Sequence, residues 1–328
     1  MRCASIDIGT NTLRLLIGEV SFGNGLKTIV YKRTITRLGG GYTIDGGIPE
    51  EAFERTLSAI CDFKKILDEH GVALDRVYAV ATSVVRRAVN GAAFVAEARK
   101  RTGIEVSVIS GSDEAAFSLA GVLSAVEPSG KDRLVMDIGG GSTEFILARG
   151  GAAIGLWSMD LGVVHLAETF IKSDPPAGVE VIEMEKEITG VIAALKQRMK
   201  KDGVDPGKCS SEAGVELVGT AGTVTTLAAI EQDLKVYDKS LINNYVLRLG
   251  NIKGIYKDLL RLGLKERAKV LSLEKGREDL IIPGSAISFI LMESFGFDSM
   301  RVSDAGLLEG VLLSKVLPVK DATIQGGL

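Results

Sequence analysis

The chain has 328 residues, of which 46% are hydrophobic and 25% are charged, and its formal net charge is −3. This composition is typical of a globular protein and excludes a disordered or fibrous chain, and the length predicts two domains. Three scattered cysteines and two histidines argue against a disulfide framework or a Cys/His metal centre. No apolar run resembles a signal peptide or a membrane span, so we expect a cytoplasmic protein.

The first half of the chain alternates strands with helices. SIDIGTNT, at Ser5–Thr12, predicts a hairpin of two strands around a tight polar turn. A helix is expected to start at Pro49 and to stop at Gly71, because proline suits a first helical position and glycine ends a helix. A strand at RVYAVAT, a pair of helices, a strand at IEVSVIS and a helix that begins near Ser112 should follow.

The second half begins with the same order of elements. MDIGGGST, at Met136–Thr143, repeats the pattern of strand, glycine turn and strand. A strand, a loop and a helix are expected at ELVGTAGTVTTLAAIE, and LIIPGSAISFILM predicts a buried core element. Strands that alternate with helices in both halves predict an α/β fold with a mixed sheet in each.

Each glycine turn follows an aspartate, Asp7 in the first half and Asp137 in the second. Glycines let the backbone approach a ligand and turn its N–H groups inward, which makes a nest for phosphate oxygens. Because a carboxylate beside that nest would repel phosphate, the two aspartates imply a bound hard cation such as Mg²⁺. The structural alternative is two ordinary strand-end aspartates in Asx turns, which the repetition in both halves disfavours.

The segment GTAGT, Gly219–Thr223, lies between a predicted strand and a predicted helix. In that place it would present helix N-terminal N–H groups to an anion. A tight helix entry with Thr223 as the N-cap explains the segment equally well. The sequence has neither a P-loop motif nor a GxGxxG that opens the chain.

Positive charge is concentrated at Arg248–Arg277, which holds nine Lys or Arg against three Asp or Glu, a surplus of six. Lys257, Arg261 and Lys265 are four residues apart and would share one face of a helix. We expect either a solvated helix face or an extension of a polyanion-binding track.

The order and form of eight motifs resemble the exopolyphosphatase/guanosine pentaphosphate phosphatase (Ppx/GppA) family in its short, two-domain form. The resemblance implies a duplicated actin/Hsp70/sugar-kinase (ribonuclease H-like) fold with phosphate loops that face an interdomain cleft. Because the pattern of strand, glycine turn and strand restarts after Pro128-Ser129-Gly130, we expect one domain at 1–126, to which 300–328 returns, and a second at 127–299. The motifs are SIDIGTNTLRLLIGEV, RLGGGYTIDGGI, ATSVVRRAVN, ISGSDEA, DIGGGSTE, GTAGTVTTLAAI, GREDLIIPG and VSDAGLLEG.

The resemblance also implies residue roles. Glu114, in ISGSDEA, would be the catalytic base that activates water; without the family it reads as a first-turn helix acid paired with Asp113. Asp137 and Glu144 would be catalytic and, together with Asp7, would hold Mg²⁺ or Mn²⁺. Substrate binding is expected of Gly9, Thr10, Asn11, Arg14, Arg86, Gly139, Gly140, Gly141, Ser142, Gly219, Thr220 and Arg277.

The leading functional interpretation is hydrolysis of terminal phosphoanhydride bonds, with release of orthophosphate from polyphosphate or from guanosine pentaphosphate. The alternatives are an ATP-dependent small-molecule kinase of the same fold, an actin-like filament subunit, and a non-catalytic polyphosphate or alarmone sensor. The chain lacks the Cys/His cluster of zinc-bearing sugar kinases, and a sensor could dispense with Glu114. We expect no nucleic-acid or membrane partner. The sequence is compatible with a homodimer.

Overall fold

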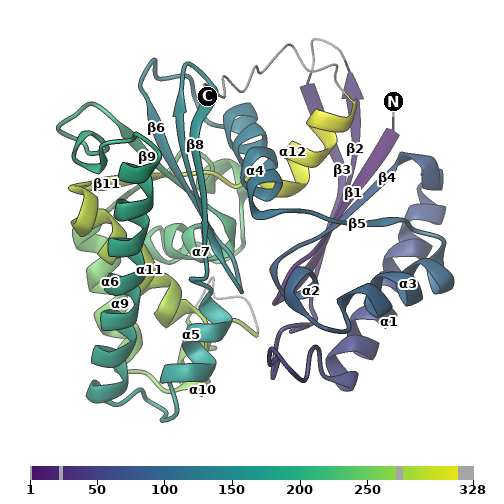
Figure 1. Ribbon diagram of the computed structural model, residues 1–328, viewed down its shortest axis with the longest axis horizontal. Coiled ribbons are helices and arrows are strands. Elements are labelled where there is room, and N and C mark those ends of the chain that lie inside the picture. Colours follow the sequence, from purple (N-terminus) through teal and green to yellow (C-terminus); the bar gives the residue numbers. More distant parts are fainter. Residues whose placement is uncertain (1, 22–24, 271–275, 317–328) are drawn as a thin grey trace. The chain divides into compact units, whose positions relative to one another are not determined.

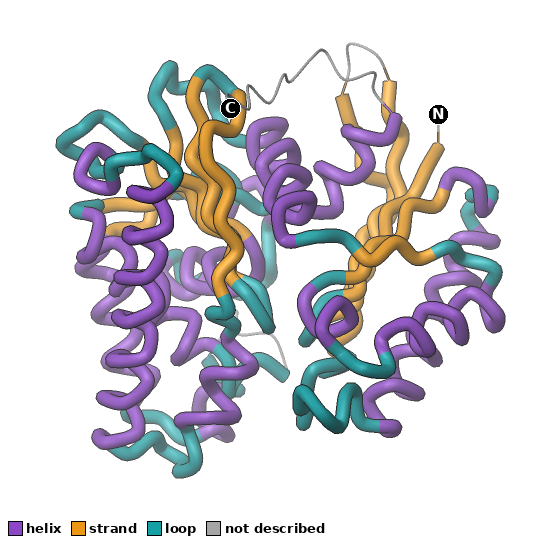
Figure 2. Tube along the Cα trace, in the orientation of Figure 1, coloured by secondary structure: helices purple, strands orange, loops and turns teal. Residues whose placement is uncertain are grey.

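The computed structural model describes residues 2–21, 25–270 and 276–316. The chain folds into two compact units, each with its own sheet and helices (Figures 1 and 2). Among the described residues, the first unit consists of 2–124 and 305–316, and the second unit of 125–304.

The described part of the first unit contains a five-stranded sheet in the order β3-β2-β1-β4-β5. The first three strands are antiparallel to one another, whereas β1, β4 and β5 are parallel. The predicted hairpin is confirmed as β1 and β2; β3 was not foreseen, because none of its residues is buried and the strand shows no clear apolar alternation. The strands are β1 (Arg2–Ile8), β2 (Thr12–Ser21), β3 (Gly25–Ile35), β4 (Val77–Ala81) and β5 (Val106–Val108).

The two faces of this sheet are covered by different helices (Figure 1). Side chains alternate along β1, so Ile6 and Ile8 face the core under α1 and α3, whereas Cys3 and Ser5 face α12. The Ser5 hydroxyl donates to the Leu308 carbonyl at 2.9 Å. The helices are α1 (Glu50–Glu69, after Pro49 at the N-cap), α2 (Ser83–Arg87), α3 (Gly91–Thr102), α4 (Gly111–Ala125) and α12 (Leu307–Val316), with a 3₁₀ turn at Leu74–Arg76.

The described part of the second unit contains a six-stranded sheet in the order β10-β11-β9-β6-β7-β8. Its strands β6, β7 and β8 are antiparallel, and β6, β9 and β11 are parallel, so the arrangement of the first sheet is repeated. The expected α/β fold with a duplicated mixed sheet is therefore confirmed. The strands are β6 (Arg133–Ile138), β7 (Thr143–Arg149), β8 (Ala152–Met159), β9 (Glu216–Thr220), β10 (Val246–Arg248) and β11 (Ser299–Val302).

Strand β11 sets the place where the chain returns to the first unit. From the sequence we expected the chain to return to the first unit at residue 300. Residues 299–302 instead form β11, which pairs with both β9 and β10 of the second sheet. The return therefore begins only at Ala305.

Helix α11 is the centre of the second unit's core and is buried over most of its length. This confirms the core element predicted from LIIPGSAISFILM. Within the described ranges, no helix is long and apolar enough to cross a membrane. The helices of this unit are α5 (Val163–Phe170), α6 (Gly178–Lys201), α7 (Ala221–Glu231), α8 (Lys239–Ile242), α9 (Leu249–Leu260), α10 (Leu264–Arg267) and α11 (Ile281–Phe295), with a 3₁₀ turn at Pro206–Lys208.

Helix α9 ends at Leu260, which corrects the expectation for the basic stretch. Lys257 is in its last turn, Arg261 is its C-cap residue, and Lys265 belongs to the separate α10. The three side chains therefore do not share one helical face. Lys275, also counted in the basic stretch, lies outside the described residues.

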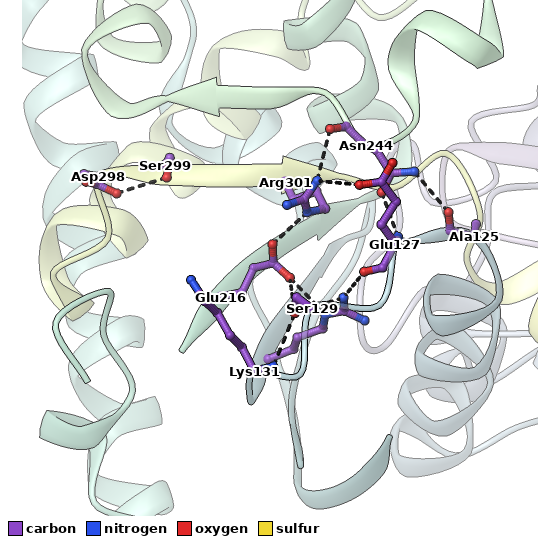
Figure 3. A network of polar contacts seen from close by, with 10 residues as sticks. Ala125, Glu127, Ser129, Lys131, Glu216, Asn244, Asp298, Ser299 and Arg301 are labelled. Carbon is purple, nitrogen blue, oxygen red and sulfur yellow. Dashed lines mark hydrogen bonds and ion pairs between the residues drawn. The ribbon is translucent and has the colours of Figure 1, made fainter. Parts of the chain in front are cut away.

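A network of ion pairs and hydrogen bonds fixes the chain where it enters the second unit (Figure 3). Glu216 of β9 accepts hydrogen bonds from Arg133 Nε at 3.0 Å and from Arg301 Nε at 2.7 Å. Asn244 lies beside Arg301, and its Nδ2 donates to the Ala125 carbonyl at 3.2 Å. The Glu216 carboxylate thus joins β6, β9 and β11 close to Ala125, the residue at which the second unit begins.

Burial raises the pKa of Glu216, but the hydrogen bonds from Arg301 and Arg133 outweigh burial and hold the pKa below that of an ordinary glutamate. Its contribution to stability is therefore present above the unfolded glutamate pKa of about 4.3, and it is lost as the pH falls through the lower folded pKa.

We expect Glu216→Gln to lower the free energy of unfolding at pH 7 by about 2–3 kcal/mol. This loss is smaller than the ~3–5 kcal/mol expected when one partner of a fully buried ion pair is removed, because 22% of the Arg301 side chain is exposed. Urea unfolding followed by circular dichroism measures this loss, with the exposed Glu212→Gln as control. The difference from wild type should shrink below about pH 4, and equal stabilities of the two variants at pH 7 would contradict the assignment.

Candidate functional site

The predicted residues of the first unit gather at one edge of its sheet. The parallel strands β1, β4 and β5 end at this edge, and the chain continues from them into the loop after Ile8, into α2 and into α4. In sheets of this kind, ligands bind outside the carboxyl ends of the parallel strands. The edge therefore brings together the Gly9–Asn11 loop, Arg86 of α2 and Glu114 of α4.

The Gly9–Asn11 loop is held by its own backbone and by the segment after β3. Gly9 N–H donates to the Thr12 carbonyl at 3.1 Å, and a Cβ on Gly9 would lie 3.0 Å from that oxygen. Gly39 N–H donates to the Thr10 carbonyl at 2.8 Å. With these carbonyls occupied on one side, the loop can offer N–H groups to an anion on the other.

Asp7 and Arg14 form a close ion pair at the start of this loop. They are directly opposite each other on β1 and β2, and Arg14 donates to Asp7 Oδ2 from Nε at 2.8 Å and from Nη2 at 2.6 Å. Asp7 Oδ1 and Asn11 Oδ1 are buried with no hydrogen-bond partner in the described chain. Buried oxygens of this kind usually bind water, an ion or a ligand donor.

Glu114 is buried, with 8% of its surface exposed, and contacts Arg86. Arg86 Nη1 lies 3.3 Å from Glu114 Oε2 and donates to the Ile109 carbonyl at 2.7 Å. Asp113 and Glu114 are both in the first turn of α4, as the alternative reading expected. The Asp113 carboxylate is directed to the start of the helix, where its Oδ2 accepts from the Ser110 hydroxyl at 2.7 Å.

Glu114 and Asp7 belong to the same face of the first sheet. Val80 is opposite Asp7 in the β1–β4 register, and it packs in a cluster with Phe117 of α4. Glu114 comes three residues before Phe117 and so projects from the same side of that helix. A candidate base and the start of a candidate phosphate loop thus share one face.

The second unit repeats the loop but changes its charges. Gly139 N–H donates to the Ser142 carbonyl at 2.9 Å, in the same way that Gly9 donates to Thr12. Asp137 then corresponds to Asp7, and the residue opposite it is Glu144 rather than an arginine. Asp137 and Glu144 are 9% and 1% exposed, and Ser158 Oγ donates to Glu144 Oε1 at 2.8 Å.

Two buried carboxylates directly opposite each other repel unless a cation or a proton lies between them. Asp137 and Glu144 suit a hard divalent cation, since Mg²⁺ binds through one or two carboxylates together with water and substrate oxygens. No cluster of three or more His, Cys, Asp or Glu that could hold a metal occurs among the described residues. The pair therefore fits Mg²⁺ or Mn²⁺ better than a metal that needs a complete protein cage. Asp7, the third predicted ligand, fits less well because Arg14 already neutralises it.

The GTAGT segment and Arg277 come together at the start of α7. Thr220 is the N-cap residue of this helix, so Thr223 is not. Ala221 has a left-handed φ of 69°, and the Arg277 guanidinium lies where a Cβ on Gly222 would be, 1.6 Å from Nη1. Because Thr220 is opposite Asp137 in the β6–β9 register, the predicted residues of this unit also share one sheet edge.

The structural role of Arg267 was not predicted from the sequence. Arg267 was counted in the basic stretch, but it is buried, ion-paired with Asp174 at 3.1 Å, and donates to the Glu278 carbonyl at 2.9 Å. The Gly276 N–H is bound by the Glu278 carboxylate at 2.7 Å. Arg267 thus supports the short segment that carries Arg277.

The chain is similar to known proteins over most of its length. The model of the Ppx/GppA phosphatase family matches residues 16–318. Exopolyphosphatase 2 of Mycobacterium tuberculosis is 32% identical over 95% of this chain and 98% of its own length. A guanosine-5'-triphosphate,3'-diphosphate pyrophosphatase of Pseudoalteromonas translucida is 28% identical over 98% of this chain and 61% of its own.

Among solved structures, the crystal structure of the type II variant of the Aquifex aeolicus Ppx/GppA phosphatase is 34% identical. The two structures match over 97% of this chain and 100% of the Aquifex aeolicus chain, with a TM-score of 0.74. The family match extends over most of the chain and covers strands of both sheets, although it begins after β1. The chain therefore belongs to the Ppx/GppA phosphatase family, whose relatives named above are hydrolases of phosphoric anhydrides.

Proposed function

We propose that this chain hydrolyses terminal phosphoanhydride bonds with the help of a divalent cation, and that it releases orthophosphate from inorganic polyphosphate or from guanosine pentaphosphate. The names of the relatives, an exopolyphosphatase and a guanosine pentaphosphate pyrophosphatase, support both substrates. The observation that carries the proposal is a buried acid, Glu114, whose carboxylate is in contact with Arg86.

In this reaction Glu114 accepts a proton from the attacking water. Its contact with Arg86 orients the carboxylate and keeps a cation near the oxygens of the transferred group. The loop N–H groups that follow Gly9 and Gly139 bind phosphate oxygens, because the N–H groups of these two glycines already donate to the Thr12 and Ser142 carbonyls. Asp137 and Glu144 would hold the divalent cation, which supplies positive charge to the phosphate oxygens when bound.

Substrate class is tested with purified chain in Mg²⁺, offered polyphosphates of several lengths, guanosine pentaphosphate and ATP in parallel. Released orthophosphate is measured for each. Release from polyphosphate or guanosine pentaphosphate supports the proposal. Phosphate transfer from ATP to a small acceptor, without release from either of the other two, would instead indicate a kinase.

We expect Glu114→Gln to lower the rate of phosphate release by about 10²–10⁴, the usual cost of a lost general base, while the substrate still binds. Steady-state kinetics and a direct binding assay separate the two effects. Asp113→Asn, which changes the adjacent cap of the same helix, is the control and should stay active. If Glu114→Gln kept half of the wild-type turnover, Glu114 could not be the base.

We expect EDTA to abolish activity and Mg²⁺ or Mn²⁺ to restore it. Asp137→Ala should weaken cation binding by at least ~10–100-fold, the loss caused by removing even an outer partner of a metal ligand. Asp7→Ala should have a smaller effect, because Arg14 already pairs with one of its oxygens. Calorimetric titration with Mn²⁺ measures binding independently of turnover, and full activity in excess chelator would refute the cation requirement.

A further inference from the structure

Three polar side chains form a row across the second sheet. Glu144 of β7 is directly opposite Asp137 on β6 and directly opposite Ser158 on β8, and such partners project from the same face. The Ser158 hydroxyl donates to Glu144 Oε1 at 2.8 Å. A hydrogen bond to one oxygen fixes the rotation of the whole carboxylate, which is how an outer partner orients a metal ligand. Ser158 therefore sets how Glu144 faces the side of Asp137.

The chain that follows β8 also holds the glycine loop between β6 and β7. At the start of α5, Val163 N–H donates to the Gly139 carbonyl at 3.2 Å, and Val164 N–H donates to the Gly140 carbonyl at 2.9 Å. In a trans peptide the carbonyl and the N–H group of the same unit point in opposite directions. The two N–H groups that share peptides with these carbonyls are therefore directed away from α5, as a nest for phosphate oxygens requires.

Gly162, the N-cap residue of α5, lets this helix approach the loop so closely. A Cβ on Gly162 would lie 2.2 Å from the Gly140 carbonyl oxygen and 2.4 Å from the Gly141 backbone, which is too close unless the backbone moves. The φ of Gly162 is −110°, a value open to any residue. The close contact with the loop, and not the backbone conformation, is therefore what requires glycine here.

The first unit repeats this arrangement with different residues. Gly39, in the segment after β3, donates its N–H to the Thr10 carbonyl at 2.8 Å, and a Cβ on Gly39 would lie 2.3 Å from Thr10 Cγ2. Strands β3 and β8 have the same place in their sheets, as the third antiparallel strand of each. Each unit thus uses a glycine after its third strand to bring a segment against its candidate phosphate loop.

We propose that residues 158–164 position both parts of the second unit's site: Ser158 orients Glu144 toward a divalent cation, and Gly162 sets the glycine loop for phosphate. Both residues act through another group, so they are positioning residues. Arg198 of α6 holds the start of the segment, because its Nη1 donates to the Ser158 carbonyl at 3.2 Å. The inference rests on the proposed function. Since the two contacts are at opposite ends of the segment, cation binding and phosphate binding should be separable by substitution.

Calorimetric titration with Mn²⁺ alone tests Ser158. We expect Ser158→Ala to weaken Mn²⁺ binding about tenfold, the lower end of the loss caused by removing an outer partner of a metal ligand. Ser158→Thr retains the hydroxyl and suits a strand, so it should bind Mn²⁺ as wild type does. The control is Ser299→Ala on β11 of the same sheet, which also removes a hydroxyl that donates to a carboxylate, that of Asp298 at 3.0 Å. It should leave Mn²⁺ binding unchanged.

Binding of tripolyphosphate in EDTA tests Gly162. We expect Gly162→Ala to weaken it about tenfold, the effect of one lost charge-assisted hydrogen bond, because the new Cβ displaces the loop. Gly190→Ala in α6 is the control, since its Cβ would meet nothing within 4 Å. Val163→Pro is the second variant if Gly162→Ala folds poorly. It removes the N–H bound to Gly139 at the first helical position, which proline favours, and it should also weaken tripolyphosphate binding.

The two assays together distinguish positioning from general destabilisation. Ser158→Ala should bind tripolyphosphate in EDTA as wild type does, and Gly162→Ala should bind Mn²⁺ as wild type does. An equal loss of both affinities in either variant would overturn the proposal. So would wild-type Mn²⁺ affinity in Ser158→Ala, or wild-type tripolyphosphate affinity in Gly162→Ala and Val163→Pro.

The proposed function is judged separately, by hydrolysis. Wild-type protein that binds Mn²⁺ and tripolyphosphate but releases no orthophosphate would refute the proposed function alone, since the binding assays still decide the positioning roles. Wild-type protein that binds neither probe would refute both.

Discussion

A hydrogen bond from a glycine N–H to the carbonyl three residues later closes the turn between the first two strands of each sheet. It joins Gly9 to Thr12 at 3.1 Å and Gly139 to Ser142 at 2.9 Å. The closure fixes the antiparallel register that follows, so the residue two positions before each glycine is opposite the residue two positions after the turn closes. Asp7 is thereby opposite Arg14, and Asp137 opposite Glu144.

The same geometry thus yields opposite electrostatics in the two units. In the first unit, Arg14 neutralises the aspartate, and Arg33 is opposite Arg14 on β3. In the second unit, two buried carboxylates face each other, which is the arrangement expected of a site for a hard cation. Glu114 and Arg86 add a buried acid and its cationic partner to the first unit.

Charge counted along a sequence proved a poor guide to where charged side chains lie in the fold. The basic stretch looked like a continuous cationic face, but Arg267 is a buried support of the segment that carries Arg277. Burial of an arginine costs desolvation energy, which must be offset by hydrogen bonds and an opposite charge. For Arg267 these partners are Asp174 and the Glu278 carbonyl. By contrast, Arg33 was not singled out, because nothing along the sequence shows that it is opposite Arg14 on the neighbouring strand.

The sequence by itself determined the α/β class, the duplication, the family and the segments that carry Asp7, Glu114, Asp137 and Glu144. These follow from local patterns: alternation in strands, glycine turns and motifs whose spacing is visible along the chain. Only the tertiary structure decided that Arg14 neutralises Asp7, that Asp113 binds the Ser110 hydroxyl at the start of α4, and that Arg33 is opposite Arg14. Those outcomes depend on strand register and on helix ends, where a shift of one residue moves a side chain to the other face, and no local pattern encodes that shift.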